Sequence, residues 1–110
     1  MSARSKLIHM LPCLFCEQEG NVQPNKTTEH HQNKFELAGH ERMGDAYSVP
    51  ACQWHHQGYC LKGWTVEAMT HVYGPSLYHD KEQFRECYGS DSQQLAITND
   101  KLERLLPATA

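Results

Sequence analysis

Two pairs of potential metal ligands lie far apart in this chain of 110 residues. Cys13 and Cys16 are separated by two residues, and Cys52 and His55 by two more. This spacing lets both ligand atoms of a pair face one zinc ion at about 2.3 Å, and four such ligands complete a tetrahedron. A redox Cys-x-x-Cys is the alternative, but it needs a surrounding βαβ pattern that is not visible here. The sequence therefore predicts a structural zinc site formed by Cys13, Cys16, Cys52 and His55.

Two histidine pairs stand beside these ligands, His30-His31 and His55-His56. Adjacent residues of a strand point to opposite faces, so His30 and His31 are suited to different roles, a metal ligand and a base. A second metal ion can lie between His30 and His56. One isolated His-His pair is more often two polar surface residues. Two pairs bracketing the predicted zinc site favour a role in metal binding or catalysis.

The elements that must position these residues form a strand, strand, helix pattern. Strands are predicted at 26–32 and 46–51, and Pro50 either confines the second to an edge of the sheet or lies at an end of the strand. Asp80 is a good N-cap for a helix at 81–88, and Cys87 is expected on its buried face. The other expected elements are a helical turn at 5–11, a loop at 35–44, a helical turn at 52–58 and a helix at about 99–106, with 59–78 left undecided.

Composition sets limits on the class of protein. The formal net charge is −3, which argues against binding nucleic acid through the overall field. Five cysteines, an odd number, favour metal binding over a disulfide framework. No apolar run approaches the roughly 20 residues that span a bilayer. We expect one cytoplasmic α+β domain over residues 1–110, with its core at about 13–89.

The run from Cys13 to His56 resembles an HNH (ββα-metal, His-Me finger) endonuclease with an embedded zinc knuckle. This resemblance implies that His30 and His56 bind a catalytic metal and that His31 is the base. HNH enzymes usually carry an orienting asparagine near the position of Tyr47, where this chain has none; Asp45 or a backbone carbonyl would have to serve. A further ligand is usual at the position of Cys60, a thiol ill suited to magnesium.

A narrower resemblance covers about residues 13–101. The segments 55–58 (His-His-Gln-Gly), 76–79 and 88–89 are similar to the phage-encoded recombination-enhancement (Ref) nucleases, which act on DNA with RecA filaments. This resemblance implies a phage-encoded protein, in a bacterium or phage-infected host, and suggests His79 as the third ligand of the catalytic metal.

The expected function is hydrolysis of DNA phosphodiester bonds by a single divalent ion (Mg²⁺, Mn²⁺ or Zn²⁺) and His31, in addition to the structural zinc. DNA and a RecA filament are the expected partners, with no membrane. The alternative is a non-catalytic zinc-ribbon module that binds DNA or a protein partner. The sequence leaves open the catalytic metal, the substrate structure, the oligomeric state and the roles of Cys60 and His40.

Overall fold

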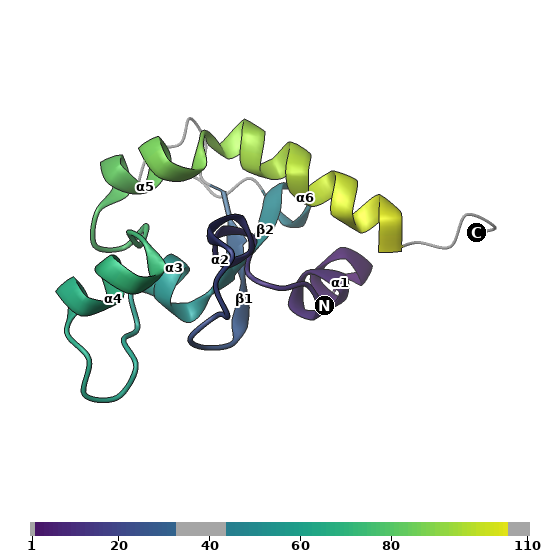
Figure 1. The fold of residues 1–110 in the computed structure, drawn as a ribbon. Helices are drawn as coiled ribbons and strands as arrows, with labels where there is room; N and C mark the ends of the chain where they lie inside the picture. Colours follow the sequence, from purple (N-terminus) through teal and green to yellow (C-terminus); the bar gives the residue numbers. More distant parts are fainter. Residues whose placement is uncertain (1, 33–43, 106–110) are drawn as a thin grey trace.

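A two-stranded antiparallel sheet lies at the centre of the fold in the computed structural model, which describes residues 2–32 and 44–105 (Figure 1). Strand β1 (Thr27–His31) pairs with β2 (Ser48–Cys52) in a register that sets Thr27 opposite Cys52 and His31 opposite Ser48. The first predicted strand is confirmed. The second starts two residues later than predicted because Asp45–Tyr47 forms a 3₁₀ turn, η2. Pro50 fits because both strands of such a sheet are edges.

Six helices surround the sheet in the described part of the chain. Asp80 caps α5 as predicted, since its carboxylate accepts a hydrogen bond from the Gln83 amide at 3.1 Å. The helices are α1 (Ala3–Met10), α2 (Leu14–Glu19), α3 (Gln53–Gln57), α4 (Val66–Tyr73), α5 (Lys81–Tyr88) and α6 (Asp91–Leu105). None of these helices is long and apolar enough to cross a membrane. The predicted loop at 35–44 and His40 lie outside the described residues, apart from Gly44.

Helix α6 is much longer than the predicted segment at 99–106. Ser90 and Gln93 form a reciprocal pair at its start: the Gln93 amide donates to the Ser90 hydroxyl at 3.2 Å, and the Ser90 amide donates to the Gln93 side-chain oxygen at 2.8 Å. Such a capping box marks a helix N-terminus. The spacing of Ser90 and Gln93 was the sequence signal for this longer helix.

The main core gathers around Phe15 of α2. Its ring meets Phe84 edge-on at 4.6 Å between centroids and Tyr88 at 5.0 Å. Trp54 is fully buried in the same cluster, and its indole N–H donates to the Gly74 carbonyl at 3.0 Å. The expectation that Cys87 is a core residue was wrong. Phe84 and Tyr88, one turn apart, already cover the buried face of α5, and Cys87 is exposed.

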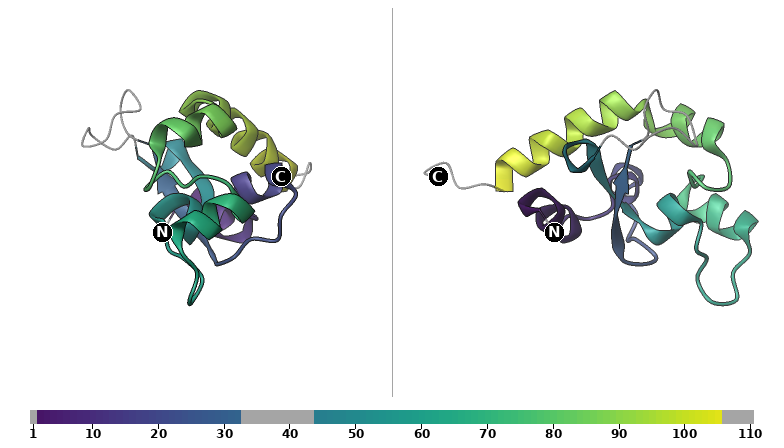
Figure 2. Two further views of the ribbon diagram at one scale, coloured as in Figure 1. Left: turned by 60° about the vertical axis from the view of Figure 1, so that its left-hand side comes forward. Right: turned by 180° about the vertical axis from the view of Figure 1, so that it is seen from behind.

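A second apolar cluster joins the two ends of the described chain. Ile8 and Leu11 pack against Leu102 of α6, and Arg4 donates to the Asn99 side chain at 2.8 Å. The view from behind shows α1 lying beneath α6 (Figure 2, right). Apolar packing thus extends beyond the predicted core at 13–89.

Candidate metal centre and neighbouring histidines

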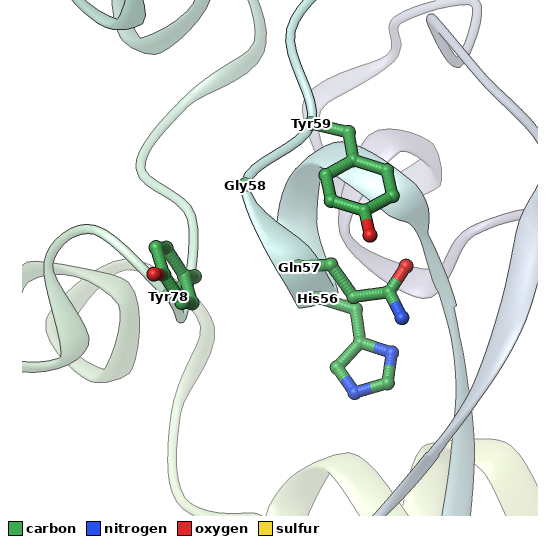
Figure 3. Close-up of a pocket in the computed structure, with 5 residues that line it drawn as sticks. All are labelled: His56, Gln57, Gly58, Tyr59 and Tyr78. Carbon is green, nitrogen blue, oxygen red and sulfur yellow. The ribbon is translucent and has the colours of Figure 1, made fainter.

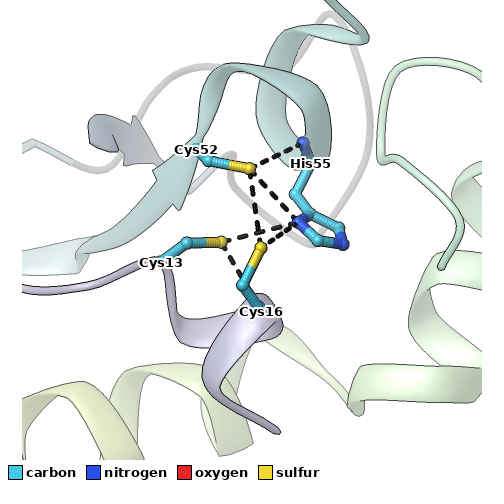
Figure 4. A group of neighbouring side chains, drawn as sticks. All are labelled: Cys13, Cys16, Cys52 and His55. Atoms are coloured by element: carbon cyan, nitrogen blue, oxygen red, sulfur yellow. Dashed lines mark hydrogen bonds between the residues drawn. The ribbon is translucent and has the colours of Figure 1, made fainter. Parts of the chain in front are cut away.

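Cys13, Cys16, Cys52 and His55 converge in one buried cluster (Figure 4). The Nδ1 atom of His55 lies 3.5, 3.4 and 3.3 Å from the sulfurs of Cys13, Cys16 and Cys52. The sulfurs of Cys16 and Cys52 are 3.9 Å apart. A tetrahedral zinc ion with ordinary bond lengths separates two sulfurs by about 3.8 Å and sulfur from nitrogen by about 3.5 Å. The donor set therefore fits a zinc-sized ion.

The two halves of the cluster have the same local construction. Cys13 is the N-cap of α2 and Cys52 is the N-cap of α3. Each sulfur accepts a hydrogen bond at 3.5 Å from the backbone amide three residues later, that of Cys16 or His55. The first turn of each helix thus turns the second ligand back toward the first. Amide donors directed at sulfur also favour the thiolate form that binds metal.

His55 is held on its outer side as well. Its Nε2 lies 2.8 Å from the Tyr73 carbonyl and 3.3 Å from the Tyr88 hydroxyl. The Tyr88 hydroxyl donates to the Glu19 carboxylate at 2.9 Å. Burial, followed by this contact with Glu19, raises the pKa of Tyr88 above its usual range, so the hydroxyl keeps its proton. A carbonyl partner at Nε2 directs the lone pair of Nδ1 toward the sulfurs, as metal-ligating histidines require.

The cluster perturbs the protonation of its members. Burial acts to raise the pKa of the Cys13 thiol, but hydrogen bonds with Cys16, Cys52 and His55 outweigh it and lower that pKa far below its usual value. Hydrogen bonds to Cys13 and Cys52 raise the pKa of Cys16. Burial acts to lower the pKa of His55, but hydrogen bonds with Cys13 and Cys52 outweigh it and raise this pKa to about 9. A doubly charged cation between the four residues would favour three thiolates and a neutral imidazole.

His30 and His56 come together on one face of β1, with ring centroids 4.7 Å apart. Thr28 lies on the same face, and its hydroxyl donates to the Ala51 carbonyl at 2.7 Å. The same oxygen is 2.9 Å from Nδ1 of His56, so it must accept a proton from that nitrogen. His56 is therefore the Nδ1–H tautomer, and the lone pair of its ring is on Nε2.

His31 lies on the opposite face of β1, the side of α1. Its Nε2 is 3.7 Å from a Glu29 carboxylate oxygen, and the same oxygen accepts a hydrogen bond from the Ser5 hydroxyl at 2.9 Å. Glu29, two residues before His31, shares its face by strand alternation, a signal that the sequence reasoning missed. The side chain of Asp45, considered as an orienting group, is outside the described part.

His79 is placed apart from His30 and His56. Its ring lies against Trp54 at 5.5 Å, and its Nε2 is 3.1 Å from the Gly58 carbonyl. Because a carbonyl can only accept, Nε2 carries the proton and only Nδ1 can bind a metal. Within residues 2–32 and 44–105, the cysteine cluster is the only group of three or more potential ligands that meets at metal-binding distances.

A pocket of about 540 Å³ opens beside His56 (Figure 3). Its walls come from the end of α3 and from the segment before α5. Tyr78 stands across the opening from His56 and Gln57, and Tyr59 rises beside Gln57. The lining residues are His56, Gln57, Gly58, Tyr59 and Tyr78. Sequence reasoning did not single out the two tyrosines as functional residues.

The fold and the site define a small α+β protein with a buried Cys₃His cluster that can hold a metal ion. A family model described as "Recombination enhancement, RecA-dependent nuclease" matches residues 2–103. The chain belongs to this family of nucleases, and the resemblance to Ref nucleases seen in the sequence is confirmed. No curated protein and no solved structure matched in the corresponding comparisons.

Proposed function

We propose that the protein is a DNA endonuclease of the HNH type that hydrolyses phosphodiester bonds with a divalent metal ion, in phage-linked recombination. Membership of a RecA-dependent nuclease family implies a DNA substrate and the participation of RecA. The observation that carries the finer proposal is the contact between His30 and His56 beside the buried Cys₃His cluster.

The structural metal in this proposal is zinc, held by Cys13, Cys16, Cys52 and His55. Three thiolates and one imidazole are soft and borderline ligands, which suit zinc and exclude magnesium or calcium. Because all four donors come from the protein and are buried, the site leaves no open position for a substrate. Its role is to hold α2 against β2 and α3.

The catalytic metal would be held by His30, His56 and His79. When bound there, a divalent ion supplies polarisation of the phosphate and stabilisation of the leaving 3′ oxygen. His56 presents Nε2, and His79 would have to turn its Nδ1 toward the ion, which requires a change of ring position. An all-imidazole set favours transition-metal ions over magnesium.

His31 would accept the proton of the attacking water. His31 follows His30 directly at the C-terminal end of β1, so the two imidazoles stand at the same end of the strand although they start from opposite faces. A Glu29 carboxylate oxygen lies 3.7 Å from Nε2 of His31 and can orient the imidazole ring. This carboxylate takes the part usually played by the asparagine that the chain lacks.

The test is a nicking assay on supercoiled plasmid and on circular single-stranded DNA. Zinc-loaded protein is incubated with Mg²⁺, Mn²⁺ or added Zn²⁺, each with and without a RecA filament. We expect cleavage with at least one of these ions, strongest when the filament is present, and none with His56→Ala. Absence of cleavage in every combination, with zinc bound and the protein folded, would refute the proposal.

A further inference from the structure

The two tyrosines that line the pocket beside His56 are unusually exposed for aromatic side chains. Tyr78 is 72% exposed and Tyr59 55% exposed. Neither belongs to the buried apolar clusters. Large apolar rings left open to water on both sides of a pocket usually mark a binding surface.

The pocket walls are fixed by backbone contacts. The Asn25 side chain donates to the Tyr59 carbonyl at 3.0 Å, and the Tyr59 amide donates to the Gln53 carbonyl at 3.2 Å. On the other side, the Leu77 amide donates to the His55 carbonyl at 2.8 Å. Tyr78 also meets the His79 ring edge-on, with centroids 5.0 Å apart. Both rings therefore project from anchored backbone.

The glycine at the end of α3 brings the two walls together. Gly58 has φ +75°, and a Cβ there would lie 3.0 Å from a Tyr78 ring carbon and 2.5 Å from His79 Nε2. Only a residue without a side chain permits this approach. The pocket thus depends on Gly58 and lies next to His56, a proposed metal ligand.

The chemistry of the pocket selects among ligands. The formal net charge of the chain is −3, so phosphate contacts alone give weak attraction to DNA. Aromatic faces provide affinity that does not depend on charge, since every nucleobase has a π-face to stack. The Gln57 side-chain amide can both donate to and accept from a base edge. A base paired and stacked within a duplex cannot enter such a pocket.

We infer that Tyr59 and Tyr78 hold an unstacked nucleobase of single-stranded DNA and so place the neighbouring phosphate at His56. This inference rests on the proposed nuclease function and specifies its substrate: single-stranded or locally unpaired DNA.

The experiment measures binding of a fluorescent single-stranded oligonucleotide by full-length, zinc-loaded protein without Mg²⁺ or Mn²⁺. Tyr78→Ala and Tyr59→Ala are each expected to weaken binding on the order of 10- to 100-fold, the usual effect of losing one stacked base. Tyr78→Trp should keep most of the affinity. Trp64→Ala is the matched control, because Trp64 is 40% exposed but lies outside the pocket. Binding of a duplex of the same sequence should not depend on Tyr78.

A cleavage assay on the same variants separates this inference from the proposed function. If the wild type cleaves single-stranded DNA and both tyrosine-to-alanine variants bind and cleave as it does, the inference is overturned and the nuclease proposal stands. If the wild type cleaves nothing but its binding depends on the tyrosines, nucleobase binding is supported and the nuclease proposal fails. Equal loss of affinity in Trp64→Ala would also overturn the inference.

Discussion

His30 and His31 are neighbours in sequence but belong to different faces of β1. His30 meets His56, whereas His31 meets Glu29 and, through it, Ser5 of α1. Alternation along the strand accounts for this separation. The two imidazoles therefore have different neighbours, which suits the different roles proposed for them, a metal ligand and a base.

Substitution of His31 directly tests its proposed role as the base. We expect His31→Ala to lower the rate of DNA cleavage by about 10²- to 10⁴-fold, the usual contribution of a general base. Its zinc content and thermal unfolding should match the wild type, since His31 is outside the buried clusters. The readouts are single-turnover cleavage and zinc analysis. A variant that cuts as fast as the wild type would remove His31 from the mechanism.

Thr28 should affect metal binding without touching the metal. Its hydroxyl accepts the Nδ1 proton of His56 and so keeps Nε2 as the donor atom. Loss of such a partner typically weakens metal affinity by about 10- to 100-fold. Thr28→Val should thus need more Mn²⁺ for half-maximal cleavage, while Thr28→Ser should behave as the wild type. Identical Mn²⁺ titrations for Thr28→Val and wild type would contradict this role.

At the scale of elements, helices α2 and α3 begin and end in the same way. Each starts at a cysteine whose sulfur caps the helix, and each ends at a glycine in the left-handed region, Gly20 at φ 70° and Gly58 at φ 75°. The difference lies in their surroundings. Nothing lies within 4 Å of a Cβ built on Gly20, whereas one on Gly58 would meet His79 and Tyr78.

This pair of glycines gives a matched comparison. Gly20→Ala should lower the free energy of unfolding by about 1–2 kcal/mol, the cost of the left-handed conformation for an L-residue. Gly58→Ala should cost more, and it should also weaken binding of single-stranded DNA, because the segment carrying Tyr78 must move away. Urea unfolding at fixed zinc concentration and oligonucleotide binding provide the measurements. Equal effects of the two substitutions on both would mean that the contact at Gly58 is not needed.

Local signals in the sequence predicted some elements well and missed others. Helix α5 matched its predicted bounds because Asp80 and Gly89 mark both ends. The start of α6 was missed, although Ser90 and Gln93 carry a capping pattern. Helix α4 lay in an undecided stretch, where Thr65 now caps it by accepting from the Ala68 amide at 3.1 Å.

In the candidate site, too, some residues could be predicted from the sequence and others could not. The residues of the Cys₃His cluster could be predicted because short motifs contain both the ligand types and their spacing. The pocket could not be predicted, since Tyr59 and Tyr78 line it together only because the segment carrying Tyr78 approaches Gly58 closely. The placement of His79 against Trp54 was also unpredictable, because it depends on how the segment before α5 packs on α3.

For the whole molecule, the Cys₃His cluster is the point where most elements meet. Its ligands come from α2 and from the junction of β2 with α3, and His55 reaches further to the end of α4 and to Tyr88 of α5. The main apolar core includes all three cysteines of the cluster. A cation at this point would hold together segments that are far apart in the sequence.

Removal of the metal should therefore unfold the protein. Binding of structural zinc supplies about 10–16 kcal/mol in small zinc domains, which is comparable to the usual total stability of about 5–15 kcal/mol. We expect a strong chelator, or Cys16→Ser, to abolish the cooperative thermal transition and most of the helical circular dichroism, and added zinc to restore both in the chelated wild type. Cys87→Ser is the control, because Cys87 is exposed and outside the cluster. A metal-free wild type that still unfolds cooperatively at the same temperature would show that the cluster does not hold the fold together.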